Sequence, residues 1–538
     1  MIKVNTNQIK RFYAFVKENI VTMIVIIAIL LCAIFTILII EDKETSSEDE
    51  NFVYEDVSNQ RFGISNLHSL DPIASTDRDT YHIDKLIFNG LFKLENDRSL
   101  KMDLAKEYKC DKAKGTVQIT IQDNVKFHQG ETLTPADVIY TYEYICSMDD
   151  SPYYQFANKI ESIEAMGSNS IMVKFKSPKD ASLSNLTFPI LKEGQGDFGK
   201  KYSPNGTGQY KISKYNKSKY IELKPNKDYY GDVATNKLYF QIFPKSTVVE
   251  NLLTSYEVTA LVDFDYNKTE TTSTNGVTCE YIPSNNFDYV GFNFKNKALE
   301  NVELRQAIAY TVDLNEVVAD TYGQGAMVSD SIYFPGYLGT ENTGDPYKPN
   351  SNKAIKLIDK IKLSDKNKDG FLDDEDGDTI ELDILVNKND AHRVLFANSL
   401  SESLNELQIK NNIVAVSWKT YSSYVKKGEF DILIGGYQAN YSDNLRFMFD
   451  KHNNINFKDK NIVEMVDNLN RCDTVENYNL AFTQLKNKLI EELPYYCICY
   501  KRCALLGSPK MNFEEYPNYD NVYKGVSTWQ FKKIIKEE

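Results

Sequence analysis

The longest uninterrupted apolar run of the chain lies near its N-terminus, from Ile20 to Ile40. It contains 21 residues without a charge, and as a helix it spans about 30 Å, the thickness of a bilayer core. Lysine and arginine side chains precede the run, and the acidic stretch EDKETSSEDE follows it. This asymmetry predicts a single-pass membrane protein: a cytoplasmic tail (1–19), a transmembrane helix (20–40), an acidic tether (41–56) and an extracellular remainder.

Two other readings of this segment are weaker. The apolar run is longer than the core of a usual signal peptide, and no A-x-A-like cleavage site follows it. Cys32 raises the alternative of a lipoprotein, but Leu31 stands where that processing prefers Gly, Ala or Ser. We therefore expect an uncleaved anchor.

Beyond residue 57, segments with strand periodicity alternate with segments of helical spacing. No Pro/Gly/Ser-rich linker interrupts residues 57–538, which predicts one α/β body of interlocked lobes. The expected helices are TPADVIYTYEYICSM, capped by Thr134, the pair in NVELRQAIAYTVDLNEVVADTY, and VLFANSLSESLNELQI. The expected strands are a pair in GTVQITIQDNVKF, then SIMVKFK, YIELKP, TIELDILVN, IVAVSW, EFDILIGGY and the buried run YYCICYKRCALLG.

Net charge, cysteine spacing and the absence of catalytic motifs argue against several classes of function. The net charge of −14 argues against nucleic acid as a partner. The cysteine spacings do not form a small-domain disulfide framework, and CICYKRC fits a core strand better than a metal cluster. The five histidines form no HExxH pattern, and no G-x-S-x-G or P-loop motif occurs. We therefore predict that the protein is not an enzyme.

The stretch DKNKDGFLDDEDGD resembles a calcium-binding loop. Its candidate ligands are Asp365, Asn367, Asp369, Asp373 and Asp376. A helical pattern precedes the loop, but a strand pattern follows it where a calcium sensor needs a second helix. The sequence therefore predicts a surface helix-to-strand turn, with one structural calcium as the remaining alternative; no other cofactor is expected.

Five stretches in order resemble one family, the extracellular solute-binding proteins of peptide-type ABC importers. The most specific is VKFHQGETLTPADVIYTYEYI (125–145), with an F-x-x-G-x-x-x-T-x-x-D-V pattern. The other four are SLDPIASTDRDTYHIDKLIFNGLF (69–92), NGTGQYKISKY (205–215), LRQAIAYTVDLNEVV (304–318) and FDILIGGYQANYSDN (430–444). The resemblance covers the chain from about residue 57 to its end.

The resemblance implies a two-lobed periplasmic-binding-protein-like α/β fold with an extra inserted domain. Lobe I would comprise 57–76, 207–291 and 500–538, the inserted domain 77–206, and lobe II 292–499. The implied function is the capture of peptides in an inter-lobe cleft and their delivery to the permease of an ABC transporter. Two alternatives stay open: the same fold binding a nickel complex, haem or a sugar, and a tethered peptide-signal receptor.

The resemblance also implies ligand contacts. Tyr153 matches a tyrosine of the family that lines the cleft, and Trp418 matches a tryptophan of the family near a side-chain pocket, with core packing or chance as the alternative. The family usually has W-x-A-D-Y where this chain has Tyr437 to Tyr441, and its Asp pairs with the α-ammonium of the peptide. Here Asn440 replaces that Asp, so an amide without charge stands at the anchoring position. The full expected set is Thr76, Arg78, Tyr153, Trp418, Tyr437, Gln438, Ala439, Asn440 and Asp443.

Overall fold

The computed structural model describes residues 53–535, apart from 58, 68, 179–180, 196–203, 245–248, 265–276, 375, 440–443 and 473. The predicted tail, the transmembrane segment and most of the tether lie outside the described residues, and the last four residues of the tether form β1 (Val53–Asp56). Within the described part of the chain, no helix has the length and apolar character needed to cross a membrane. Residues 56–533 form one compact unit, to which the following description is confined.

An 11-stranded mixed sheet runs through this unit. The strand order is β16-β15-β17-β13-β18-β12-β2-β11-β10-β9, and β14 pairs with β18. The strand bounds are β2 Gln60–Ile64, β9 Tyr210–Asn216, β10 Tyr220–Pro225, β11 Leu238–Ile242, β12 Ala260–Asp263, β13 Thr278–Phe292, β14 Ala326–Met327, β15 Glu381–Asn387, β16 Lys410–Val416, β17 Ile432–Gln438 and β18 Tyr495–Gly507.

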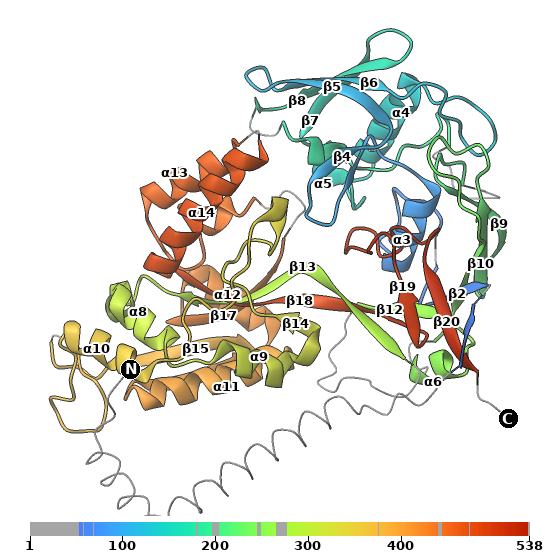
Figure 1. The fold of residues 1–538 in the computed structure, drawn as a ribbon. Coiled ribbons are helices and arrows are strands. Elements are labelled where there is room, and N and C mark those ends of the chain that lie inside the picture. The colour runs from blue at the N-terminus through green and yellow to red at the C-terminus, as the bar shows by residue number, and fades with distance from the viewer. Residues whose placement is uncertain are drawn as a thin grey trace, which may run out of the picture. The chain divides into compact units, whose positions relative to one another are not determined.

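Two long strands, β13 and β18, join the two halves of this sheet (Figure 1). They pair antiparallel from Thr278 opposite Gly507 to Gly291 opposite Tyr495. One end of β18 pairs with β12, and the opposite end of β13 pairs with β17. We call β2 with β9–β12 the β9 half, and β15–β17 the β16 half. The predicted lobe boundaries stay a prediction, but the chain does cross between the two halves through extended segments.

The β16 half is a three-layer α/β/α structure, because its parallel strands are apolar on both faces. Ile384 and Ile432 pack among α8–α11, whereas the neighbouring Leu385 and Leu433 pack on the opposite face, where Tyr421 of α12 and helices α13 and α14 lie. The helix bounds are α7 Lys297–Glu300, α8 Val302–Ala309, α9 Leu314–Tyr322, α10 Ser351–Lys360, α11 Ala391–Glu406, α12 Trp418–Lys427, α13 Lys460–Leu469 and α14 Val475–Glu492. The predicted helix pair (α8 and α9) and the strands β15, β16 and β17 are confirmed.

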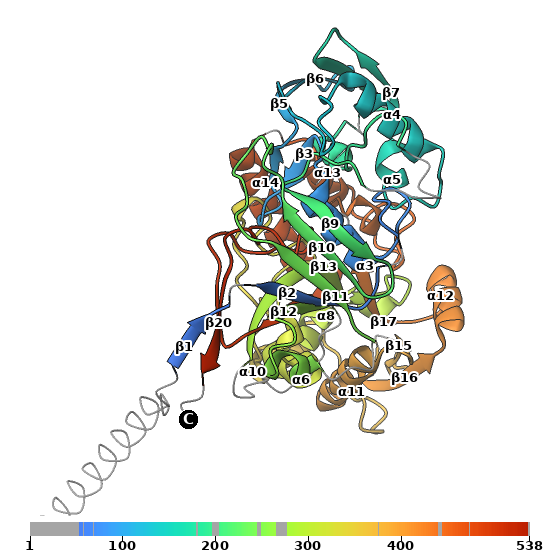
Figure 2. The same cartoon turned by 90° about the vertical axis from the view of Figure 1, so that its right-hand side faces the viewer.

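The β9 half adjoins a separate four-stranded antiparallel sheet, order β5-β6-β8-β7. In both views this small sheet lies at the upper end and β15 lies towards the lower end (Figures 1 and 2). The remaining bounds are α3 Arg78–Ile87, β3 Phe92–Leu94, β4 Leu100–Met102, β5 Ala105–Asp111, β6 Thr116–Ile121, α4 Pro135–Cys146, α5 Tyr154–Ala157, β7 Ile160–Ala165, β8 Ser170–Phe175, α6 Val249–Thr254, β19 Lys510–Asn512 and β20 Gln530–Ile535.

Local sequence signals explain where some of these elements begin and end. Thr134 caps α4 as predicted, and it forms a capping box with Asp137. The sequence predicts two strands in residues 115–127. The first is confirmed as β6, and the second is wrong, because residues 122–127 form no strand. The chain turns at Asn124, which has a positive φ of 63°, and continues as a tight loop in which the amide of Phe127 donates to the carbonyl of Glu131.

The apolar run 495–507 is the buried strand β18, as predicted. Cys497, Cys499 and Cys503 are all buried within it. Burial raises the pKa of the Cys503 thiol to about 12, as is typical of a sulfur packed in a protein core. The core-packing interpretation of CICYKRC is therefore the one that fits.

Candidate ligand-binding site

The strands of the β16 half end at a common edge of the sheet. Because β15 is parallel to both β16 and β17, their carboxyl ends lie on the same side. In open α/β sheets, ligands bind outside the carboxyl ends of parallel strands. Trp418 and Tyr437, predicted from sequence, stand at the ends of β16 and β17. The topology therefore places these two predicted residues on one edge.

Trp418 and Tyr153 differ in exposure. Trp418 is 59% exposed at the start of α12, and its ring stacks on Tyr421 at 5.5 Å between centroids. Core packing therefore does not account for Trp418. Tyr153 is only 6% exposed and stacks on Tyr81, so core packing remains a sufficient reason for that aromatic residue. Tyr153 also lines a second cavity, between α3 and the segment 514–528.

Tyr437 belongs to a continuous row of aromatic rings. Phe334 contacts Tyr500 at 5.8 Å, and Tyr500 contacts Phe287 at 5.3 Å. Phe287 in turn contacts Tyr437 at 6.0 Å, and Tyr437 contacts Phe447 at 4.7 Å. These separations are typical of favourable ring pairs. The row crosses β13 and β18 and ends at Phe447, which is 41% exposed.

The backbone just before the anchoring position is firmly held. The amide of Ala439 donates to the carbonyl of Asn285 at 2.8 Å, and the side-chain amide of Asn285 donates to the carbonyl of Ala439 at 2.6 Å. Ala439 is buried, whereas Gln438 is exposed. Asn440 and Asp443 lie outside the described residues, so their ligand contacts stay predictions.

A buried ion cluster lies directly behind this strand edge. The carboxylate of Asp288 on β13 is fully buried and lies 2.7 Å from Arg393 Nη2 of α11. Lys501 Nζ of β18 lies 3.2 Å from the other carboxylate oxygen, and the Tyr322 hydroxyl donates to that oxygen at 2.7 Å. Burial favours the protonated carboxyl, but Arg393 and Lys501 outweigh burial and hold the pKa of Asp288 below its usual range.

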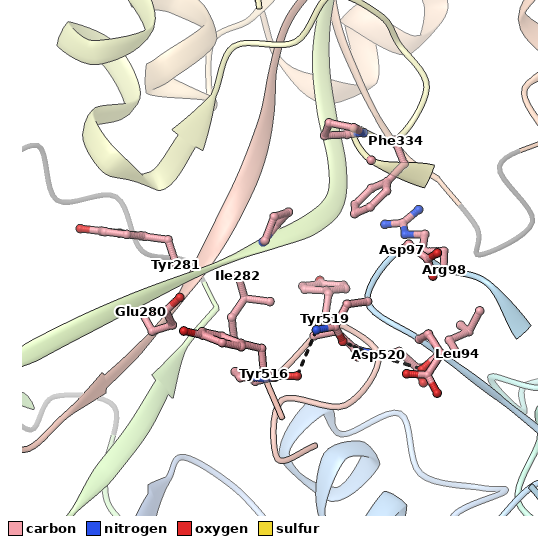
Figure 3. Close-up of a pocket in the computed structure, with 17 residues that line it drawn as sticks. Leu94, Asp97, Arg98, Glu280, Tyr281, Ile282, Phe334, Tyr516, Tyr519 and Asp520 are labelled. Atoms are coloured by element: carbon pink, nitrogen blue, oxygen red, sulfur yellow. Dashed lines mark hydrogen bonds between the residues drawn. The ribbon is translucent and has the colours of Figure 1, made fainter. Parts of the chain in front are cut away.

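A cavity of about 380 Å³ opens beside the crossing strand β13 (Figure 3). Four separate segments line it: 94–98, 280–283, 334–336 and 516–520. Phe334 belongs to the core of the β16 half, whereas Tyr519 packs on the core of the β9 half. Both halves therefore contribute walls, which is the usual position of a ligand site in a two-lobed protein.

One wall of the cavity is a contact between the two halves. Strand β3 packs in the same core as the β9 half, and the guanidinium carbon of Arg98, in the turn between β3 and β4, lies 3.4 Å from the centroid of the Phe334 ring. Next to it, the amide of Leu338 donates to the carbonyl of Asp97 at 2.8 Å. Arg98 and Leu338 both have positive φ, 60° and 49°, although neither is glycine. Such backbone conformations cluster at ligand and switch regions.

The predicted residues Thr76 and Arg78 lie elsewhere. Both are exposed where α3 begins, and the Arg78 guanidinium lies 4.7 Å from the centroid of the Phe264 ring. Neither is among the residues that line the 380 Å³ cavity.

Sequence reasoning missed Arg393, Arg98, Glu280 and the tyrosines of the 516–520 segment. Arg393 had a usable signal, because it follows a strand by a few residues and opens a helix at the ligand-binding edge. The cavity residues had none, because they meet only through tertiary contacts.

The fold and site together define a class: a two-lobed binding protein whose halves are joined by crossing strands and share the walls of a cavity. The chain belongs to the bacterial extracellular solute-binding proteins, family 5, whose model (the family's middle region) matches residues 99–456. The family expected from sequence is thereby confirmed.

Individual proteins agree with this assignment. The oligopeptide-binding protein AppA of Bacillus subtilis (strain 168) is 22% identical over 502 residues, 87% of this chain and 90% of AppA. The fold is similar to MppA, the periplasmic murein tripeptide binding protein in its unliganded open form, with a TM-score of 0.76, 16% identity and coverage of 90% and 99% of the two chains. It is also similar to NikZ of Campylobacter jejuni in complex with Ni(L-His), with a TM-score of 0.61, 21% identity and coverage of 88% and 99%.

The calcium-like loop is a helix-to-strand turn, as predicted. It follows α10 and leads into β15, and Gly370 adopts the positive φ that the turn requires. The Asp365 carboxylate accepts the backbone amides of Lys368, Asp369 and Gly370. The Thr379 hydroxyl bonds to oxygens of Asp369 and Asp373.

The oxygens of this turn are of the kind that calcium prefers. However, among the described residues, which omit Glu375, no three His, Cys, Asp or Glu side chains form a group that could hold a metal ion. The hydrogen bonds that the Asp365 carboxylate accepts from backbone amides are sufficient to shape the turn. A bound calcium stays an untested alternative.

Removing Arg393 is expected to destabilise the protein by about 3 kcal/mol, because it leaves part of the buried Asp288 charge uncompensated. Urea denaturation of the full-length Arg393→Gln variant measures this loss. Lys106→Gln is the control, since its 2.6 Å pair with Asp123 is exposed and is expected to contribute less than about 1 kcal/mol. The double change Asp288→Asn with Arg393→Gln should recover part of the loss; no recovery would contradict an electrostatic cause.

Acidification gives an independent check of the same interaction. Because the folded-state pKa of Asp288 is lowered, its ion pairs stabilise the fold above the ordinary carboxyl pKa of about 3.9 and lose this effect as the pH falls through the folded value. The stability difference between the native chain and Arg393→Gln should therefore shrink below about pH 4. A difference that stays constant from pH 7 to pH 3 would indicate a packing effect instead.

Because the turn is shaped by its own hydrogen bonds, calcium titration of the full-length chain is expected to give no more heat than titration of Asp369→Ala. Isothermal calorimetry compares the two proteins. A saturable heat that disappears in Asp369→Ala would contradict this expectation and assign a calcium ion to the loop.

Proposed function

We propose that this chain is a membrane-tethered extracellular receptor that captures peptides between its two halves and delivers them to the permease of an ABC transporter. The observation that carries the proposal is the cavity at the crossing strand, with walls from both halves. A ligand held there contacts both halves, so its binding favours the conformation in which they are closed around it. The proposal includes no catalytic step.

Relatives support peptides as the ligand class. AppA is named for oligopeptide binding, and another relative, the di/tripeptide-binding protein 1 of Pseudomonas aeruginosa, is 24% identical over 403 residues. The exposed Trp418 and the aromatic row ending at Phe447 provide flat apolar surfaces at the strand edge. Such surfaces accept varied side chains, as a peptide receptor with broad tolerance requires.

The tether and the transporter partner rest on the sequence and the family. The apolar run 20–40 has the length of a membrane span, and the basic residues before it favour an extracellular location for the remainder. An anchored receptor stays close to a permease in the same membrane, which raises the effective concentration of the complex.

A nickel complex is the second candidate ligand, because NikZ, which shares the fold, binds Ni(L-His). The neutral Asn440 favours this alternative, since it lacks the charge that would anchor a free peptide amine.

Mass spectrometry of the ligand that co-purifies with the full-length chain tests the proposal. We expect a set of peptide masses of varied composition, because a receptor that holds the peptide backbone tolerates many side chains. A single non-peptide mass, or a nickel complex, would contradict the proposal.

Asn440 is expected to weaken the preference for peptides with a free N-terminus, because an amide adds no charge to oppose the ammonium. The measurement compares affinities for one peptide with a free and an acetylated N-terminus, in the native chain and in Asn440→Asp. The variant should increase the preference for the free amine by about tenfold or more. If the native chain already discriminates strongly and Asn440→Asp changes nothing, residue 440 is not the anchoring position.

A further inference from the structure

The cavity beside β13 contains five charged side chains, and most of them already have partners. Glu95 pairs with Lys524 Nζ at 2.6 Å. Asp520 accepts the Tyr81 hydroxyl at 2.5 Å and pairs with Lys85 Nζ at 3.2 Å. These two carboxylates are therefore compensated within the protein.

The charged pair at the turn between β3 and β4 is also engaged. The Asp97 carboxylate accepts the backbone amide of Ser99 at 2.9 Å. The guanidinium carbon of Arg98 lies 3.4 Å from the centroid of the Phe334 ring, at the side of the cavity away from Glu280 (Figure 3). The turn thus keeps its own charges close to the contact between the two halves.

Glu280 differs from these residues. It is half-buried on β13 and lines the cavity. No hydrogen bond or ion pair joins its carboxylate to another residue in the part of the chain that the structure describes. A carboxylate that is partly removed from water and lacks a cation is costly, and a cationic ligand would remove that cost.

Aromatic side chains complete the surroundings of Glu280. Tyr281, Tyr516 and Tyr519 line the same cavity. In Figure 3, Tyr516 lies just below Glu280 and Tyr519 lies nearer the middle of the cavity, whereas the Tyr281 side chain points away from them. Aromatic faces attract ammonium and guanidinium groups, and a carboxylate beside them is the usual arrangement for recognising a cation. The net charge of −14 also favours the approach of cationic ligands.

We propose that Glu280 is a specificity-determining residue that pairs with a cationic group of the bound peptide. The inference rests on the proposed function and deepens it, because Glu280 supplies the negative charge that Asn440 lacks. The cation is either the α-ammonium of the peptide or the side chain of a lysine or arginine, and both have the same chemistry at the carboxylate.

Four pentapeptide pools distinguish these sources. The pools carry lysine or norleucine at the central position, each with a free or an acetylated N-terminus. Competition binding to the full-length native chain and to Glu280→Gln gives the affinity for each pool. Glu107→Gln is the matched control, because Glu107 is exposed on β5 and does not line the cavity.

We expect Glu280→Gln to weaken binding of one class of cationic pool by about tenfold or more, the effect of losing one charge-assisted hydrogen bond. The affinity for acetylated norleucine peptides should stay within about twofold, which also shows that the variant is folded. A loss confined to the free N-terminus assigns the α-ammonium, and a loss confined to lysine assigns the side chain.

Equal affinities of Glu280→Gln and the native chain for all four pools would overturn the inference while leaving peptide binding intact. Loss of affinity for all four pools alike, including acetylated norleucine, would also overturn it, because the effect would not depend on charge. If the native chain binds none of the pools, the proposed function fails together with the inference.

Discussion

The antiparallel pairing of β13 with β18 is the interaction on which both halves depend. The two strands pair along almost their whole length, and each is hydrogen-bonded to strands of a different half at its outer edge. Their register shifts between Asp288 and Tyr289, as at a β-bulge, where the direction of side chains changes. The fully buried carboxylate of Asp288 lies at this irregularity, and three other elements, α9, α11 and β18, supply the groups that compensate it.

This ion cluster and the neighbouring Tyr289 ring explain the two glycines of β17. Gly436 lies opposite Asp288 in the sheet, and a Cβ there would overlap the Arg393 guanidinium and the Asp288 carboxylate. A Cβ at Gly435 would press against the Tyr289 ring, 2.6 Å from its nearest atom. The two glycines are therefore required by the packing around Asp288 and Tyr289, and Tyr437 comes after them near the end of the strand. The predicted ligand residue Tyr437 and the buried ion cluster therefore depend on the same short stretch of backbone.

The sequence predicts this architecture well where the signal is local. The continuous apolar runs of β15, β17 and β18 indicate strands buried on both faces, and helical spacing gives α8, α9 and α11. Even the exposure of Trp418 agrees with a position after a strand end. The error in residues 115–127 arose because alternation continues past Ile121, whereas the positive φ at Asn124 turns the chain out of the strand.

The cavity could not be predicted in the same way. Its walls come from four segments that are separated by more than 40 residues each and meet only after the sheet has formed. In the sequence, Glu280 looks like an ordinary polar residue of a strand. The absence of a cation beside it depends on which distant segments the fold brings together, so the sequence does not show it. The family resemblance points to residues 437–443, where Asn440 replaces the usual Asp. It gives no information about another position that could supply a negative charge.

The aromatic row provides a physical connection between these two places. Phe334 lines the cavity, and the rings of Tyr500, Phe287 and Tyr437 lead from it across the crossing strands to the edge where Asn440 follows. Closely packed rings in a protein interior move little independently, so a displacement of Phe334 by a ligand is transmitted to its neighbours. Phe334 also contacts Arg98, so this one ring belongs both to the contact between the halves and to the row that leads to the strand edge. Under the proposal for Glu280, the anion that recognises the ligand stands on the crossing strand β13 and not at residue 440, where the family usually has it.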